Sequence, residues 1–223
     1  MTAFWEKIQH NRIVLHGASL KKAINQNLIY SARLTGNQFL YNEFKVMVKL
    51  FLQGFSKEEI FRKIEDENLF EYRSLKAIGK HLGAVWERIN YLDEYLMKIV
   101  ATEPNEIGRL INFYSILKYD LLFLEFMEEV VLEKVYAHQM ELSHADISNF
   151  FGIKAEQSGI ISNFKETTLK RLRAAYFELL MGAGYVVKDG SEFSLTTPIA
   201  VYQICNYLEE IGEKRYAKAM LGV

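Results

Sequence analysis

The sequence predicts a mainly α-helical protein with two helix-turn-helix-like halves, of which the C-terminal one is winged-helix-like and carries a short β-hairpin. Three observations support this prediction. Proline occurs only at Pro104 and Pro198 in 223 residues, and apolar residues recur at three- and four-residue spacing, as in amphipathic helices. Near the end of the chain, an Asp-Gly pair separates two β-prone runs, which is a strong hairpin signal.

The first half has the pattern of three helices. We expect them over residues 38–53, from a cap at Ser56 to about Ile64, and from Ser74 to about Tyr95. Gly54 is expected to end the first helix. Ser56 and Glu59 have the spacing of a capping box, in which each side chain accepts a hydrogen bond from the other residue's backbone amide. A short helix followed by a turn and a longer helix is typical of a helix-turn-helix.

The second half repeats this outline. Ser143 corresponds to Ser56 and Thr168 to Ser74 as expected helix caps, with a longer turn around residues 152–164 between the two helices. The similarity has two explanations, an internal duplication or a chance match, because caps followed by apolar spacing are common in helical proteins.

A hairpin follows the last of these helices. Gly182–Gly184 is expected to end the helix, and Tyr185–Val187 and Phe193–Thr196 are expected to pair around a turn at Lys188–Ser191. A helix that leads directly into a hairpin resembles the end of a winged helix.

One segment between the halves is expected to separate two domains. Thr102–Asn105 contains Pro104 and interrupts two long helical patterns. It predicts an N-terminal helical domain over residues 1–102 and a C-terminal helical domain over residues 105–223.

The charge balance excludes a protein that is basic over its whole surface. The 27 Lys and Arg residues are offset by 28 Asp and Glu residues, giving a net charge of −1, so DNA binding would depend on a local patch. Cys205 is the only cysteine, which excludes an intramolecular disulfide and predicts a packed core thiol in a cytoplasmic protein. No apolar run approaches the roughly 20 residues of a membrane span, and Met1–His10 lacks the apolar region of a signal peptide.

Two groups of basic residues are candidates for DNA contacts. They are Arg73, Lys76 and Lys80 in the first half, and Lys170, Arg171, Arg173 and Lys188 in the second. At 100° per residue the first group lies opposite the apolar stripe of its helix, a pattern that suits docking on phosphates. Glu87 on the same face opposes this interpretation, and an ordinary solvated face explains the pattern equally well.

The second group begins in the first two turns of the helix expected from Thr168, where a recognition helix reaches bases or phosphates. Arg171 points well away from Lys170 and Arg173, so the three residues cannot all serve one surface. Lys188 is expected at the tip of the wing, where a simple soluble turn is the alternative interpretation.

Enzyme chemistry has no support in the sequence. Nucleophile-elbow, P-loop and dinucleotide-binding motifs are absent, and the histidines show no paired metal spacing. Glu125, Glu129 and Glu133 share one helix face, but a helical di-iron site also needs Glu-x-x-His from two helices, and Glu141 with His144 supplies a single pair. We therefore expect no catalytic residues, no metal, no cofactor and no small-molecule substrate.

Four stretches of the sequence resemble one known family. Tyr30–Gly36 reads Tyr-Ser-Ala-Arg-Leu-Thr-Gly, and the similarity continues in Ile60–Leu69, Phe113–Lys134 and Thr168–Arg173, so that it covers roughly residues 30–208. These stretches resemble the BrxA family, the small accessory proteins of BREX (bacteriophage exclusion) defence systems. The resemblance implies a non-enzymatic DNA-binding accessory protein that acts in defence against phages.

Two functions of different classes remain as expectations. The first is an accessory protein that contacts duplex DNA mainly through the phosphate backbone, so that binding weakens with salt. The second is a protein-interaction or scaffold subunit without direct DNA binding, which the near-zero net charge favours. The expected partners are double-stranded DNA and other BREX proteins. Arg33 could join the DNA surface or hold helix ends together, and a transcription regulator ranks last because no heptad pattern predicts a dimer seam.

Overall fold

The computed structural model describes residues 29–36 and 39–221, except for the side chains of residues 75–77. The described chain is mainly helical and has one two-stranded antiparallel hairpin near its C-terminal end, which confirms the predicted fold class. Within this part of the chain, no helix combines the length and the apolar character that crossing a membrane requires.

The elements follow one another in three groups. The N-terminal group is the 3-10 turn η1 (Arg33–Gly36), α2 (Tyr41–Leu52), α3 (Lys57–Glu67), α4 (Leu75–Ile89) and α5 (Glu94–Thr102). The central group is α6 (Asn105–Tyr119), α7 (Leu121–Phe126), the π-helix η2 (Met127–Val131) and α8 (Leu132–Tyr136). The C-terminal group is α9 (His144–Gln157), α10 (Gly159–Ser162), α11 (Glu166–Ala183), β1 (Val186–Asp189), β2 (Glu192–Leu195), α12 (Val201–Glu210) and α13 (Lys214–Leu221).

Local sequence signals explain the boundaries in the first half. The capping box is confirmed, because Ser56 Oγ accepts from the Glu59 amide at 3.3 Å and the Glu59 carboxylate accepts from the Ser56 amide at 2.8 Å. Gly54 follows α2 with φ of 91°, a conformation that favours glycine. The predicted continuation of one helix to Tyr95 is wrong, because α4 ends at Ile89 and the Asp93 carboxylate caps a separate helix by accepting from the Leu96 amide at 2.9 Å.

Two expectations for the second half are also wrong. α9 continues through Gly152 to Gln157, and α10 occupies residues 159–162, so most of the expected turn is helical. Burial of Phe150 and Phe151 on α9 offsets the roughly 1 kcal/mol that an interior glycine costs. α11 begins at Glu166, so Thr168 lies inside the helix and its amide already donates to the Lys165 carbonyl at 2.8 Å. Thr168 and Ser74 therefore do not correspond as caps, which weakens the case for a duplication.

The hairpin is shifted relative to the predicted turn. β1 and β2 pair with Val186 opposite Leu195 and Lys188 opposite Phe193. Lys188 is therefore a strand residue and not a turn residue, because the pairing extends one step further, to Asp189 and Glu192. The two-residue turn that remains starts at Gly190, whose φ of 57° suits glycine in a tight hairpin.

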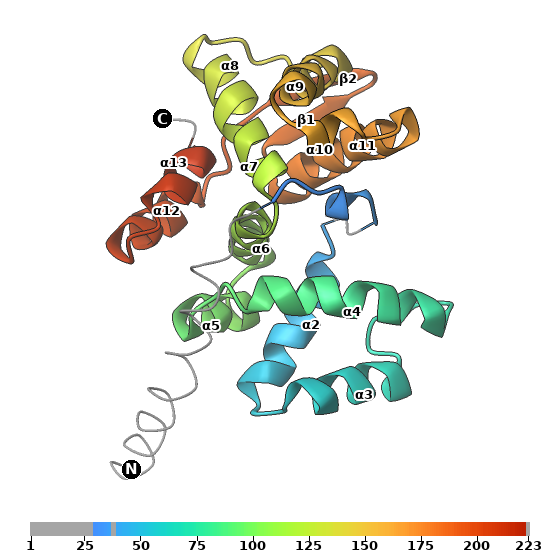
Figure 1. The fold of residues 1–223 in the computed structure, drawn as a ribbon. Coiled ribbons are helices and arrows are strands. Elements are labelled where there is room, and N and C mark those ends of the chain that lie inside the picture. The colour runs from blue at the N-terminus through green and yellow to red at the C-terminus, as the bar shows by residue number, and fades with distance from the viewer. Residues whose placement is uncertain (1–28, 37–38, 222–223) are drawn as a thin grey trace.

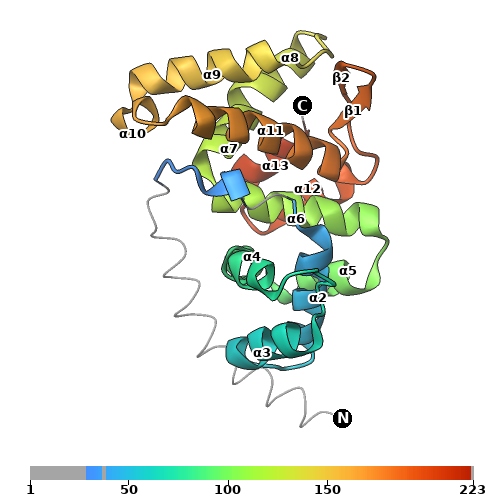
Figure 2. The ribbon, with the colours of Figure 1, turned by 90° about the vertical axis from the view of Figure 1, so that its right-hand side faces the viewer.

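Helix α6 lies in the middle of the molecule, as the two perpendicular views show (Figures 1 and 2). It packs against α2, α4 and α5 of the N-terminal group and against α11, α12 and α13 of the C-terminal group. Residues 110–117 of α6 are all buried, and the core residues of both halves form one cluster around this helix. The boundary predicted at residues 102–105 falls at the start of α6, and the division into domains over 1–102 and 105–223 stays a prediction.

The helices α12 and α13 form a hairpin against α6. The Tyr185 hydroxyl donates to the Met220 carbonyl at 2.7 Å, and Lys118 on α6 pairs with Glu213 at 2.5 Å. Cys205 is fully buried between these helices, and burial raises the pKa of its thiol to about 12, so the predicted core thiol is confirmed.

Candidate nucleic-acid interface

The extended segment that follows α8 is hydrogen-bonded to the hairpin. The Leu142 amide donates to the Phe193 carbonyl at 2.9 Å, and the Leu195 amide donates to the Met140 carbonyl at 2.6 Å. Residues 140–142 therefore run beside β2, with a bridge between Glu141 and Ser194. The chain then continues through α9, α10 and α11 before it enters the hairpin. In the sequence, these three helices therefore lie between the extended segment and the two strands of the hairpin.

Aromatic side chains fix α11 against the hairpin and against α9. The rings of Phe177 on α11 and Phe193 on β2 stack with centroids 4.0 Å apart, and His144 at the start of α9 meets Phe177 edge-on at 4.7 Å. The preceding residue of α11, Tyr176, is fully buried, and its ring centroid lies 5.0 Å from that of Phe126 and close to other rings of the core. Pairs of this kind contribute about 0.5–1.5 kcal/mol each beyond their buried area, so the orientation of α11 is well determined.

The start of α9 is anchored by a second capping box. Ser143 Oγ accepts from the Asp146 amide at 3.2 Å, and the Asp146 carboxylate accepts from the Ser143 amide at 2.7 Å and pairs with Lys134 at 3.0 Å. Partial burial alone would raise the pKa of Asp146, but the hydrogen bonds from Ser143 and the charge of Lys134 hold it below its usual value.

The N-terminal turns of α11 present the second group of basic residues. Lys170 and Arg171 are exposed, whereas Arg173 is half-buried, pairs with Glu166 at 2.7 Å and donates to Ser148 Oγ at 3.3 Å. A shallow depression of about 490 Å³ lies here, lined by His144, Ala145, Ser148, Lys170, Arg173 and Ala174. The structure thus brings Lys170 and Arg173 together, while Arg171 is not part of this lining.

Lys188 completes this group on the hairpin. Its side chain is exposed, and its ammonium lies 5.4 Å from the centroid of the Phe193 ring. This contact is within the range of a cation–π interaction and gives the lysine a preferred direction along the hairpin surface.

The first group of basic residues is arranged differently. Arg73 is exposed in the connection between α3 and α4, and the side chain of Lys76 lies outside the described residues. Lys80 is exposed on α4 and its ammonium reaches over η1, since a methyl group added at Gly36 would lie 3.0 Å from it. The connection over residues 68–74 is longer than the three- to four-residue turn of a helix-turn-helix.

The stretch Tyr30–Gly36, called the signature below, joins the two halves of the molecule. The Arg33 guanidinium lies 4.6 Å from the centroid of the Tyr119 ring, donates to the Tyr119 carbonyl at 3.3 Å, and pairs with Glu87 on α4 at 3.8 Å. Leu34 is fully buried, and η1 packs against α11. Arg33 therefore holds helix ends together, which was one of the two roles expected for it.

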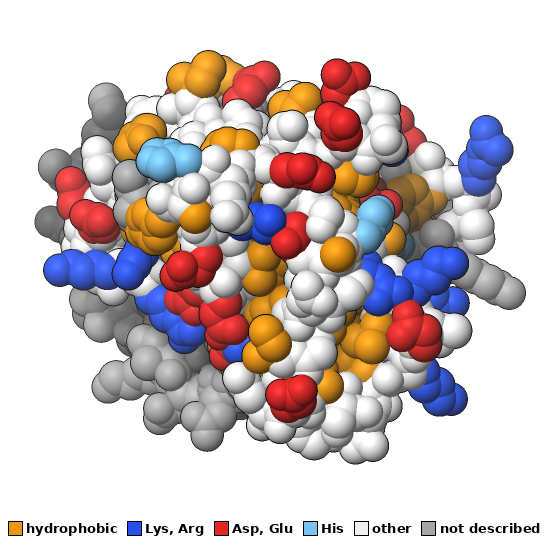
Figure 3. Space-filling view, turned by 90° about the horizontal axis from the view of Figure 1, so that it is seen from above, with side chains coloured by type: hydrophobic (Ala, Val, Ile, Leu, Met, Phe, Trp, Pro, Cys, Tyr) orange, Lys and Arg blue, Asp and Glu red, His pale blue; other side chains and the backbone are white. Residues whose placement is uncertain are grey.

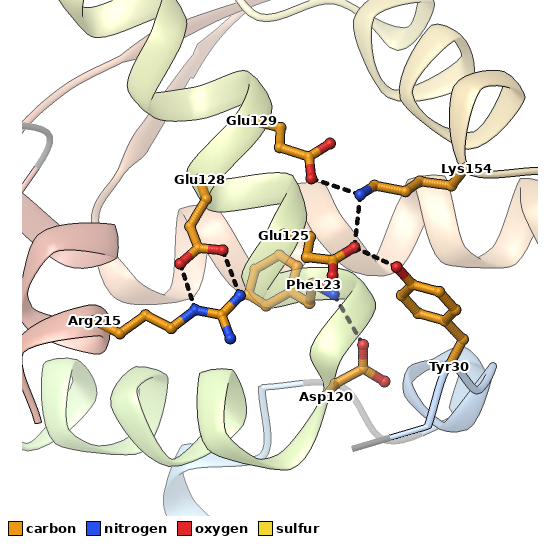
Figure 4. Close-up of polar contacts among 8 residues, drawn as sticks. All are labelled: Tyr30, Asp120, Phe123, Glu125, Glu128, Glu129, Lys154 and Arg215. Carbon is orange, nitrogen blue, oxygen red and sulfur yellow. Dashed lines mark hydrogen bonds and ion pairs between the residues drawn. The ribbon is translucent and has the colours of Figure 1, made fainter. Parts of the chain in front are cut away.

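A buried ion cluster lies above this signature (Figure 4). Lys154 on α9 is only 3% exposed, and its ammonium pairs with Glu125 at 2.6 Å and Glu129 at 2.5 Å. The Tyr30 hydroxyl donates to the same Glu125 carboxylate at 2.7 Å. Burial lowers the pKa of Lys154, but the two carboxylates outweigh this effect and hold it above its usual value. Sequence analysis missed this cluster, although one signal was present. Lys154 follows Phe150 and Phe151 within one helical turn, a position that favours burial of the lysine beside these rings.

The acidic residues of α7 and the π-helix η2 pair with two different partners, Lys154 and Arg215. Glu125 and Glu129 face Lys154, whereas Glu128 turns to the other side and accepts two hydrogen bonds from Arg215 on α13, both at 2.7 Å (Figure 4). π segments often occur where a helix must change the direction of its side chains. Among the described residues, no group of three or more His, Cys, Asp or Glu side chains is arranged to hold a metal ion.

Two buried charged residues lie near the junction of α6 and α7. Arg88 on α4 is fully buried and donates to the Phe39 carbonyl at 3.3 Å. Asp120 is 2% exposed and one of its oxygens accepts from the Phe123 amide at 2.9 Å, whereas the other has no hydrogen-bond partner. Burial raises the pKa of Asp120 to about 6, against the opposing effects of its hydrogen bond and the positive charges of Arg33 and Arg88.

The surface around α9 and the hairpin carries charges of both signs. Figure 3 shows this face from above, with Lys and Arg side chains interspersed with Asp and Glu and no continuous basic area. Any contact with a phosphate backbone on this face must therefore come from a few local side chains.

Comparisons with known proteins give one consistent result. A model of the BrxA family matches residues 28–212. A protein of Bacillus cereus (strain H3081.97) named BREX protein BrxA is 27% identical over 194 residues, which is 87% of this chain and 97% of that protein. A second BREX protein BrxA, from Paramagnetospirillum magneticum (strain ATCC 700264 / AMB-1), is 18% identical and aligns over 83% of this chain and 92% of its own length.

A solved structure has the same fold. The crystal structure of an uncharacterized protein from Magnetospirillum magneticum superposes with a TM-score of 0.75 at 17% identity, over 87% of this chain and 99% of that one. At this identity the likeness concerns the fold alone.

Proposed function

The chain belongs to the BrxA family, and on that premise we propose that it is a non-enzymatic accessory protein of a BREX defence system that binds duplex DNA through α11 and the hairpin. The observation that carries this proposal is the order of elements from residue 140 to residue 195. An extended edge, α9, the short helix α10, α11 and a returning hairpin follow one another in an order that resembles a winged helix, in which α11 would be the recognition helix.

The exposed side chains of α11 support contacts to phosphates. Lys170 and Arg171 lie in its first turns, where recognition helices reach the DNA. Lys170 and Arg171 point in different directions. Lys170 would therefore contact the phosphates of one DNA strand beside the depression, and Arg171 would contact those on the other side of the DNA groove. Arg173 is partly neutralised by Glu166 and would act mainly by positioning α9 against α11.

Lys188 and the first basic group would add further phosphate contacts. Lys188 extends along the hairpin, which in this arrangement would lie beside the backbone or the minor groove. Arg73, Lys76 and Lys80 would make a second, weaker contact, because the exposed Glu87 on α4 repels phosphates. If about four of these six side chains engage phosphates at the same time, the slope of log K against log salt should be about −3 to −4.

Fluorescence anisotropy with a mixed-sequence duplex tests this proposal. The full chain would be titrated at 50, 100 and 200 mM salt beside Lys170→Glu/Arg171→Glu and beside Lys214→Glu/Lys218→Glu. The last variant carries the same charge change at two exposed positions of α13. It therefore controls for the loss of overall positive charge.

We expect salt-sensitive binding that the α11 variant loses and the α13 variant retains, with unchanged circular dichroism for both. Equal loss in both variants would mean that only net charge matters and would reject α11 as the contact surface. An absence of binding at 50 mM salt would reject DNA binding altogether.

A second candidate is a protein-interaction subunit of the defence system. The net charge of −1 and the mixed charges of Figure 3 favour it, since they give no long-range attraction to DNA. The two roles are compatible in one adaptor that contacts DNA and another BREX protein.

A further inference from the structure

A shallow groove lies between α5, α6 and α12. Its apolar lining consists of Tyr95, Ile99, Ile107, Ile204 and Tyr207, and its polar lining of Glu103 and Gln203. The volume is about 260 Å³, which is below the roughly 300–1,000 Å³ of pockets that enclose small molecules. A groove of this size suits one or two large apolar side chains that enter from a partner.

The aromatic wall of the groove is held in place. The rings of Tyr95 and Tyr207 lie 4.4 Å apart, and the Tyr207 hydroxyl donates to the Asp93 carboxylate at 2.6 Å. Tyr95 nevertheless remains 52% exposed. A tyrosine that is fixed on one side and open on the other can bind an apolar group without losing further conformational freedom.

The charged side chains that line the groove or act on its wall are acidic. Glu103 is part of the lining, Asp93 binds the wall at Tyr207, and Glu210 is close enough to act on Tyr207 through its charge. The lining contains no Lys or Arg, and Lys98 on α5 is already paired with Glu94 at 2.7 Å. This field repels phosphates and attracts Lys and Arg side chains of a partner.

We propose that this groove binds a basic, amphipathic helical segment of another protein of the defence system. Its apolar side chains, spaced three and four residues apart, would enter the groove beside Tyr95 and Ile107, and its Lys or Arg side chains would lie against Glu103 and Glu210. No lining residue belongs to α9, α10, α11 or the hairpin, so the inference does not depend on DNA binding.

A peptide-binding assay tests the groove and its preference for charge. Fluorescein-labelled, overlapping 18-residue peptides that cover the other BREX proteins encoded with this chain would be titrated against the full chain, together with a peptide of its own residues 1–28. The variants are Tyr95→Ser and Glu103→Lys/Glu210→Lys. Their controls are Tyr136→Ser, at a tyrosine that is 48% exposed on α8, and Glu65→Lys/Glu156→Lys, at exposed positions of α3 and α9.

We expect the bound peptides to carry net positive charge and apolar residues at helical spacing. Tyr95→Ser should raise the Kd about tenfold, as for a residue at the centre of an interface. Glu103→Lys/Glu210→Lys should raise it roughly fivefold at low salt and less at high salt. The controls should stay within about twofold of the unmodified chain. Both glutamates are exposed, so the charge variant tests the proposal even if Tyr95→Ser does not fold.

Four outcomes would overturn the proposal. They are binding of no peptide, binding of acidic or uncharged peptides equally well, unchanged binding by the groove variants, and binding of the 1–28 peptide alone. Sedimentation of the chain without peptide tests whether a second copy of this chain occupies the groove. A dimer that Tyr95→Ser dissociates would assign the groove to a second copy of this chain and would also overturn the proposal.

Discussion

The α3–α4 and α9–α11 regions begin alike and end differently. Each starts with a serine capping box, at Ser56 and at Ser143. α4 then packs against α2, α3 and α6, and its Arg88 is fully buried. α11 is held at its C-terminal half by aromatic rings of the core and of the hairpin, so its first turns keep Lys170 and Arg171 exposed.

The difference shows that a cap determines where a helix starts but not which of its faces remains accessible. The neighbours of the helix decide the second question. In the first region, α4 supports the junction with α6 and α7. In the second, α11 is supported by other elements and leaves Lys170 and Arg171 exposed. The following experiments separate these two roles.

The largest effect is expected for the buried arginine of α4. Burial lowers the pKa of Arg88 to about 10, so it stays charged at neutral pH. Arg88→Met removes that charge beside Asp120 and should lower the free energy of unfolding by about 3–5 kcal/mol. Urea unfolding followed by circular dichroism measures this, with Arg62→Met at an exposed position of α3 as the control. A loss below about 1 kcal/mol would mean that α4 is not the supporting helix.

The next effect concerns the ion cluster that fixes α9 to α7. Lys154→Met leaves Glu125 and Glu129 without their shared partner and should cost about 2–4 kcal/mol, less than for a fully buried pair because Glu129 is partly exposed. Since the pKa of Lys154 is raised in the folded state, its contribution is complete below about pH 10 and is lost only above that. Unfolding at pH 7 and pH 9 should therefore give the same loss. Lys165→Met, at the exposed start of α11, is the control and should change little.

The junction of α6 and α7 should also lose stability as the pH rises, but in the acidic range. Burial raises the pKa of Asp120 from 3.8 to about 6, so the folded protein binds the proton more tightly than the unfolded one. Stability from this group is therefore complete below about pH 4 and falls by roughly 2–3 kcal/mol as the pH rises through 6. Asp120→Asn keeps an acceptor for the Phe123 amide and should remove this fall.

Urea unfolding of both forms at pH 4.5, 6 and 7.5 measures the Asp120 effect. The variant should be more stable than the unmodified chain by about 2–3 kcal/mol at pH 7.5 and by only about 1 kcal/mol at pH 4.5. A variant that is less stable at pH 7.5 would mean that the charges of Arg33 and Arg88 already stabilise the carboxylate.

DNA affinity compares the two regions directly. Lys170→Glu/Arg171→Glu should raise the Kd for duplex DNA roughly ten- to a hundredfold at 50 mM salt, or about 1.4–2.7 kcal/mol. Arg73→Glu/Lys80→Glu should raise it no more than about threefold. Anisotropy titrations with both variants check this order. A larger effect for the α4 variant would move the contact surface to the first half.

The smallest effect contrasts two glycines. Gly190 in the hairpin turn has φ of 57°, so Gly190→Ala should cost about 1 kcal/mol although no atom lies within 4 Å of the added methyl group. Gly152 lies inside α9 with equally open space, so Gly152→Ala should stabilise by about 0.5–1 kcal/mol. Thermal unfolding of both variants checks the opposite signs. A stabilising Gly190→Ala would show that the turn has another conformation.

Much of the helical structure could be predicted from short-range signals. The stripe of Ile78, Leu82 and Val85 on α4 is buried as its spacing predicts, and both serine caps are found where the sequence puts them. The error at Tyr95 arises because the Asp93 cap starts a new helix within a continuous apolar pattern. The error at Thr168 arises because α11 starts two residues earlier, at Glu166, without a side-chain cap.

The candidate surface was predictable only in part. Lys170, Arg171 and Lys188 are exposed, but exposure follows from packing and not from charge. Lys154 carries the same charge and is buried, because α7 and the π segment bring Glu125 and Glu129 to it although they lie well over 20 residues away in the chain. No periodicity within α9 could indicate those partners.

The sequence by itself determined the helical class, the hairpin and the family, because these depend on spacing, caps and short motifs that act over a few residues. The tertiary structure decided which charges are buried and which remain accessible, and it formed the groove between α5, α6 and α12. The physical reason is that the cost of burying a charge and the gain from pairing it both depend on neighbours that only folding brings together.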